Sequence, residues 1–178
     1  RQQALDTDFL KTYVRLPGTR MARVAAAARV QGVASGSHYL WPGIEAGQSL
    51  TTHLSATSRT GYTPTLSPAG RSYGDVSTLY SKGRFGLIHT PFVAASLIGE
   101  APAMVDDLRV RTLFTPEDQA ILRRNAAQPP TPAQRAEIAR TGALLAAILH
   151  GGGTVGLGTD TPLSVPAISL HLGLRSLV

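Results

Sequence analysis

Short runs of apolar and small residues alternate along this chain with longer segments of helical pattern. Each run is rich in β-branched or small residues and is bounded by glycine, proline or polar residues, which is typical of buried strands. The pattern predicts five strands, over residues 9–16, 33–38, 49–53, 86–90 and 154–159.

Helical signals fall between and after these runs. Thr19 can cap a helix to Gln31, and Gly32 can end it. Thr115 before Pro116, followed by acidic residues, indicates another helix start. Further helices are predicted over residues 71–81, 132–150 and 168–177, while residues 91–114 are ambiguous, with a helix possible near 93–98.

Strands and helices in strict alternation predict an α/β fold with parallel strands and right-handed crossovers. Five such units fit either a doubly wound sheet or part of a barrel. The segment GGGTVG, which begins at Gly151, formally fits a dinucleotide fingerprint. It lies after a helix and before a strand, the reverse of the required order, so nucleotide binding is rejected.

Composition excludes several classes of protein. The 178 residues are 43% hydrophobic, which suits a folded domain. The net charge of +6 comes from scattered arginines without interleaved aromatics, so we expect solvated helix faces and no nucleic-acid partner. No signal peptide or membrane span is recognised. The absence of cysteine restricts any metal site to nitrogen and oxygen ligands and leaves the compartment open between cytoplasm and periplasm.

The ends of the predicted strands carry the candidate chemistry. Lys11, His38, His53, His89 and Asp160 each stand at or near the carboxyl end of a different strand, or inside that rim. Parallel strands bring their carboxyl ends to one edge, where α/β barrels place their active sites. Two imidazoles and a carboxylate are an ordinary zinc-type ligand set, and an aspartate can act as a base toward a metal-activated water.

Taken singly, these residues have simpler interpretations. His38 alone would be a hydrogen-bonded core histidine, Asp160 a turn residue before Thr161, and Lys11 a solvated or snorkelling lysine. The pairing of two histidines with an aspartate at three strand ends favours the site. His89 is interpreted as lining the pocket.

Four stretches in this order resemble the amidohydrolase superfamily of metal-dependent hydrolases, in its imidazolonepropionase- and prolidase-like branch. They are DFLKTYVRLPG, SHYLWPG, HLSATSRTGY and GLGTDTP. The resemblance implies that residues 1–178 form the carboxyl-terminal portion of one barrel domain, namely strands four to eight of a (β/α)8 TIM-like barrel with their helices. The missing amino-terminal half-barrel, or a complementing chain, would then complete it, and a homo-oligomer is a further option.

The same resemblance implies the chemistry. Lys11 would be a carboxylated lysine bridging two metals, His38 and His53 would bind the second metal, and Asp160 would bind the first and shuttle the proton. The expected cofactor is a divalent metal, zinc first, as one or two ions. The expected reaction is hydrolysis of an amide or other C–N bond, possibly in a dipeptide, with metal-activated water as nucleophile. Independently of the resemblance, the position of Arg59 and Tyr62 in the loop after the third strand predicts that they bind a carboxylate or carbonyl of the small amide or peptide substrate, with ordinary loop packing as the alternative. His89 is expected to line the same substrate pocket or to support the residues that line it.

The chain departs from the family pattern at several positions. The His-x-His pair of the family's first strand is absent, Thr52 stands where glutamate often precedes the histidine, and Leu172 stands where glutamate often follows His171. The alternative is therefore a catalytically incomplete α/β piece that acts as a structural or partner-binding module.

Overall fold

Five parallel strands form a sheet in the order β1-β2-β3-β4-β5. A computed structural model describes residues 6–13, 16–54, 75–161, 165 and 167–178. The strands are β1 (Phe9–Lys11), β2 (Ala34–Ser37), β3 (Leu50–Thr52), β4 (Gly86–His89) and β5 (Val155–Leu157). Because sequential strands are neighbours in space and all run the same way, their carboxyl ends lie along one edge.

The chain divides into two units, and each is described by itself. Unit 1 contains Arg1–His89 and Leu144–Gly156, and unit 2 contains Thr90–Ala143 and Leu157–Val178. The strands of the sheet lie in unit 1, except for the last residue of β5.

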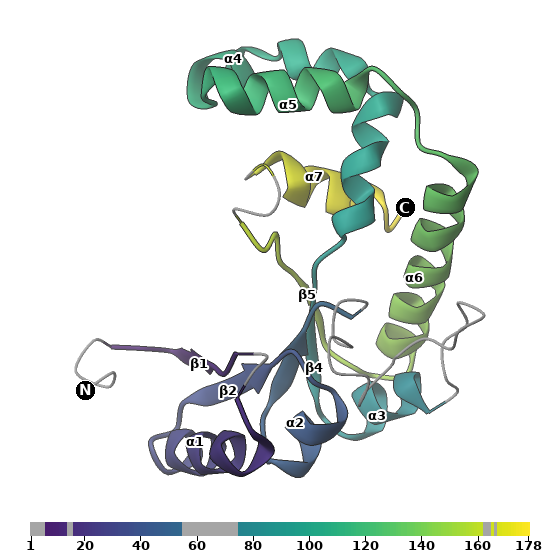
Figure 1. Ribbon diagram of the computed structural model, residues 1–178. Helices are drawn as coiled ribbons and strands as arrows, with labels where there is room; N and C mark the ends of the chain where they lie inside the picture. The colour runs from purple at the N-terminus through teal and green to yellow at the C-terminus, as the bar shows by residue number, and fades with distance from the viewer. Residues whose placement is uncertain (1–5, 14–15, 55–74, 162–164, 166) are drawn as a thin grey trace. The chain divides into compact units, whose positions relative to one another are not determined.

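The helices of unit 1 follow its strands in sequence. They are α1 (Gly18–Val30), α2 (Trp41–Glu45), α3 (Val76–Lys82) and the last two turns of α6 (Pro132–His150), and Figure 1 shows α1 and α2 side by side next to the strands. Met21, Ala25 and Ala28 recur at helical spacing on α1 and are almost fully buried. The helix ends before Gly32, whose φ of 69° suits a residue without a side chain.

The core of unit 1 joins α3 and α6 to the sheet. Tyr80 of α3 and Ile148 of α6 are fully buried with Leu87 of β4. Phe85 adds a second ring, 6.1 Å from that of Tyr80. The apolar last two turns of α6 are therefore explained by their place in this core.

Unit 2 is helical. It contains the 3₁₀ helices η2 (Phe92–Glu100) and η3 (Pro102–Asp106), then α4 (Leu108–Leu113), α5 (Pro116–Ala126), the first part of α6 and α7 (Ile168–Arg175). Its core gathers side chains from all these segments, among them Ile98, Val110, Leu122, Ile138 and Leu172.

Side-chain caps fix two of the helix starts in unit 2. The Thr115 hydroxyl accepts a hydrogen bond from the backbone of Asp118, and the Asp107 carboxylate accepts one from the backbone of Arg109. Thr115 therefore marks the start of α5, and Asp107 marks the start of α4. The Thr115 cap was predicted from the sequence.

Most predicted elements are present, with two corrections. Thr19 was predicted to cap a helix, but α1 begins at Gly18 after Pro17, so Thr19 lies inside its first turn. The predicted strand 9–16 is shorter: β1 ends at Lys11, and Thr12 adds only one more backbone bond to Gly36. Residues 91–114, left ambiguous, form η2, η3 and α4. The fold class α/β with a parallel sheet is confirmed. In the described part of the chain, no helix combines the length and apolar character needed to cross a bilayer.

Candidate functional site: an amine and three imidazoles at the strand ends

The strand register brings the predicted side chains of unit 1 to one edge of the sheet. Lys11 is opposite Gly36, Ser37 is opposite Thr51, and Thr52 is opposite Ile88. His38 and His53 follow directly after β2 and β3, and His89 closes β4. Neighbouring parallel strands therefore end at almost the same level, each with a nitrogen-bearing side chain at or just beyond its end.

Three of these side chains are in contact. The ring centroids of His38 and His53 are 4.9 Å apart, with the planes tilted by 43°. Lys11 Nζ lies 3.4 Å from His53 Nε2, a long hydrogen bond. Tyr13 stands edge-on to His38 at 5.3 Å. An amine and two imidazoles from three different strands thus form one cluster, with His53 almost fully buried and Lys11 exposed.

The backbone of His53 is held in an unusual conformation. Its φ is 63°, in the left-handed region that L-residues with a side chain avoid, at a cost of about 1–2 kcal/mol. The strand pairing enforces it, because His53 N still donates to the Ile88 carbonyl at 3.0 Å. Strain of this kind is concentrated at functional sites, and here it sets the direction in which the imidazole leaves the strand.

His89 adds a third imidazole from β4. It is 2% exposed, and its Nδ1 has no hydrogen-bond partner among the described residues. Burial, and secondarily the proximity of His53, lower the pKa of His89 to about 4. The ring is therefore neutral at pH 7 and can donate or accept one hydrogen bond to a ligand.

Polar side chains fix the strands beneath this cluster. Gln48 Nε2 donates to Thr12 Oγ1 at 2.9 Å, and the Thr51 hydroxyl donates to the Ser37 carbonyl at 2.9 Å. Gly36 lets β2 approach its neighbours, because a Cβ there would lie 2.7 Å from the Leu50 carbonyl oxygen. These buried contacts hold the strand ends in register.

The remaining predicted residues lie elsewhere. Asp160 follows β5, is half-buried with a φ of 51°, and belongs to unit 2, so its approach to the cluster stays a prediction. Arg59 and Tyr62 lie outside the described residues. Sequence reasoning missed Tyr13, which lies two residues beyond the end of β1. Its position two residues after Lys11 within the predicted strand 9–16 was the available signal, because alternate residues of a strand share a face.

The donor set suits a borderline divalent metal such as zinc, since neutral imidazoles are among its preferred ligands and a lysine amine can serve only when deprotonated or converted to a carbamate. Over the ranges described above, however, no group of three or more histidine, aspartate or glutamate side chains is already arranged to hold a metal ion.

Comparisons of the chain with models of known protein families, with curated proteins and with solved structures found no match. The arrangement in unit 1 defines the class of the molecule, an α/β protein with a parallel five-stranded sheet and a basic, imidazole-rich edge.

Proposed function

We propose that this chain is the carboxyl-terminal portion of a metal-dependent hydrolase barrel that cleaves amide or other C–N bonds. The observation that carries the proposal is the contact of Lys11 and His38 with His53 at the carboxyl edge of three adjacent parallel strands. Barrel enzymes place catalytic groups at this edge. The resemblance to the amidohydrolase superfamily at the same residues supports it.

In this proposal Lys11, His38, His53 and Asp160 hold the metal. A divalent metal supplies a Lewis acid for the scissile carbonyl and lowers the pKa of water toward about 7. Asp160 accepts the proton of the attacking water and delivers it to the leaving nitrogen, while the C–O bond forms and the C–N bond breaks. The neutral, buried His89 hydrogen-bonds the substrate and helps to orient it.

Zinc binding tests the site independently of turnover. Isothermal titration of the metal-free protein with zinc should show saturable binding. The variants His38→Asn and His53→Asn should each weaken it by more than the roughly ten- to hundredfold typical of outer-shell changes. His150→Asn is the matched control, because His150 is an exposed histidine at the end of α6. Equal affinity in all three variants would refute the metal site.

Hydrolysis tests the reaction. A panel of dipeptides and N-acyl amino acids is incubated with the zinc-loaded protein, and released amine is measured. Turnover should disappear in His53→Asn and in Asp160→Asn and persist in His150→Asn. Turnover that survives loss of Asp160 would contradict the role given to that carboxylate.

A second function is favoured by the sheet edge. Within the described residues β1 pairs on one side only, with β2. An unpaired edge can accept a further strand, so the alternative is a non-enzymatic module that binds a partner chain. The N–H of Thr12 faces β2, so the N–H of Phe9 faces the free edge. Zinc-independent binding of a partner chain, abolished by Phe9→Pro in β1, would support this alternative over the hydrolase.

A further inference from the structure

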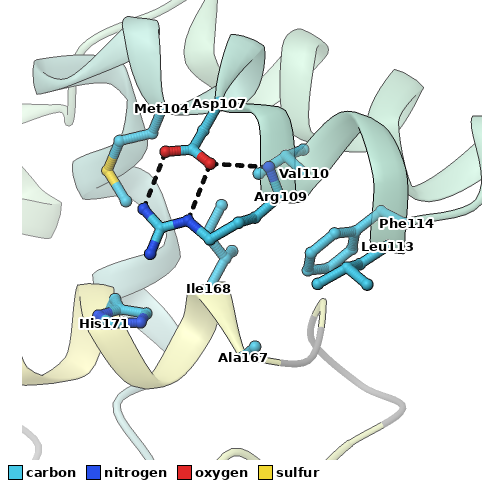
Figure 2. Close-up of a pocket in the computed structure, with 9 residues that line it drawn as sticks. All are labelled: Met104, Asp107, Arg109, Val110, Leu113, Phe114, Ala167, Ile168 and His171. Carbon is cyan, nitrogen blue, oxygen red and sulfur yellow. Dashed lines mark hydrogen bonds and ion pairs between the residues drawn. The ribbon is translucent and has the colours of Figure 1, made fainter.

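Unit 2 contains a cavity of about 220 Å³ between the segment η3–α4 and helix α7. Figure 2 shows its lining, which includes Met104, Val110 and Phe114 from one side and Ile168 and His171 from α7. All of these residues lie within one unit, so the cavity is defined without reference to the strand-end cluster.

Most of the lining is apolar; part of it is buried, whereas Leu113 is 76% exposed. Val110 and Ile168 are 5% and 6% exposed and belong to the core of unit 2, against which Met104 and Phe114 also pack. Small-molecule pockets have this composition, an apolar wall with few polar groups. At about 220 Å³ the cavity is smaller than the roughly 300–1,000 Å³ of typical ligand sites, so its ligand has a short apolar body.

The polar groups of the lining are His171 and an ion pair between Arg109, whose side chain is 78% exposed, and Asp107. Arg109 donates to Asp107 through Nε at 2.9 Å and Nη2 at 2.8 Å. The backbone N–H of Arg109 also donates to the Asp107 carboxylate. These hydrogen bonds engage both carboxylate oxygens of Asp107 and hold the pKa of Asp107 below its ordinary value.

The rest of the guanidinium remains available. Figure 2 shows its third nitrogen, Nη1, pointing away from Asp107 toward α7, on the side of the cavity where His171 lies. A guanidinium has five N–H donors, and Nη1 has no partner among the described residues. Phe114 and Leu113 lie at the other end of the same cavity. The lining is thus amphipathic: donors at one end, apolar side chains at the other.

We propose that this cavity binds a small carboxylic acid with an apolar body, such as a medium-chain alkanoate or an arylalkanoate. The carboxylate accepts hydrogen bonds from Arg109 Nη1 and from the His171 ring, and the apolar body lies against Val110, Phe114 and Ile168. Arg109 Nη1 would donate a charge-assisted hydrogen bond to the ligand carboxylate, and because such a bond is roughly twice as strong as a neutral one, an anion binds more tightly than an alcohol of the same length.

Methionine methyl NMR gives a direct readout, because the chain has two methionines. Met104 lines the cavity, whereas Met21 is buried in α1 of unit 1. The protein is labelled at the methionine methyl groups, and Met104→Leu assigns the two signals. Titration with octanoate should shift the Met104 signal saturably and leave the Met21 signal in place.

Three ligands and two variants separate the contributions. Octan-1-ol has the same apolar body without the charge and should bind at least tenfold more weakly than octanoate; octylamine should not bind. Arg109→Gln should reduce the octanoate affinity to that of octan-1-ol. Arg111 lies on the same helix but outside the lining, so Arg111→Gln is the control and should leave the octanoate affinity unchanged.

Three results would overturn the proposal. The first is an unshifted Met104 signal at saturating octanoate. The second is equal affinity of octanoate and octan-1-ol in the unaltered protein, and the third is equal loss of octanoate affinity in Arg109→Gln and Arg111→Gln, because either of these would remove the role of the guanidinium. Circular dichroism of each variant establishes that it is folded before it is titrated.

Discussion

The left-handed backbone of His53 allows a test in which glycine and alanine should exchange their usual order of stability. In an ordinary strand, glycine is less stable than alanine by roughly 0.5–1 kcal/mol, because it loses more backbone freedom on folding. At a φ of 63° the alanine Cβ meets the carbonyl oxygen that follows it, at about 1–2 kcal/mol. We therefore expect His53→Gly to be more stable than His53→Ala by about 0.5–1 kcal/mol.

The pair Thr52→Gly and Thr52→Ala is the matched control. Thr52 is the preceding residue, lies in β3 and is 5% exposed against 4% for His53, so the burial of one methyl group is nearly the same at both positions. Its φ is not among the positive values. Alanine should therefore be the more stable of the two at position 52, and the difference between the positions isolates the backbone term.

Urea unfolding followed by circular dichroism measures all four variants, with equal m values required for the comparison. A His53→Ala variant as stable as His53→Gly would refute the strain at this residue. The two variants at position 53 also test the metal site, because both His53→Gly and His53→Ala should lose zinc binding. Loss of binding in the more stable variant, His53→Gly, would show that zinc affinity depends on the imidazole rather than on the integrity of the fold.

Four further predictions concern single side chains. Tyr80→Phe should stabilise the protein by about 1 kcal/mol in urea unfolding, because the Tyr80 hydroxyl is fully buried without a partner among the described residues; a loss of stability would reveal a hydrogen bond to that hydroxyl. Gly36→Ala should destabilise by at least about 1–3 kcal/mol through overpacking against Leu50, and an unchanged urea midpoint would contradict the close strand approach. Thr115→Ala should cost about 1 kcal/mol through loss of the helix cap, whereas Thr112→Ala, within α4, should not show a capping loss. The folded pKa of His89 is about 4, below its unfolded value of about 6.5, so stability should fall as pH is lowered from 6.5 toward 4 while the unfolded chain gains the proton; His89→Gln should flatten the dependence in this window, and an unaltered slope would contradict the neutral, buried ring.

Local signals in the sequence were sufficient where a residue acts on its own backbone or on its near neighbours. The cap at Thr115, the helix stop at Gly32 and the alternation of strands and helices depend on short-range geometry, so they predicted α5, the end of α1 and the parallel sheet. Residues 91–114 were left ambiguous, with a helix possible near 93–98 where η2 lies, because the short turns of 3₁₀ helices give no sustained hydrophobic periodicity. What fixes them is packing in the core of unit 2, which includes Val110 and Leu122.

The sequence by itself placed His38 and His53 at strand ends and Lys11 within the first strand, and so predicted which residue types lie near one edge of the sheet. Only the tertiary structure decided that they touch, since the strand register brings residues 42 positions apart to within 3.4 Å and turns the His53 backbone into a left-handed conformation. The cavity beside Arg109 was invisible in the sequence for the same physical reason. Its walls come from segments about sixty residues apart, and no local pattern records that α7 packs beside η3 and α4.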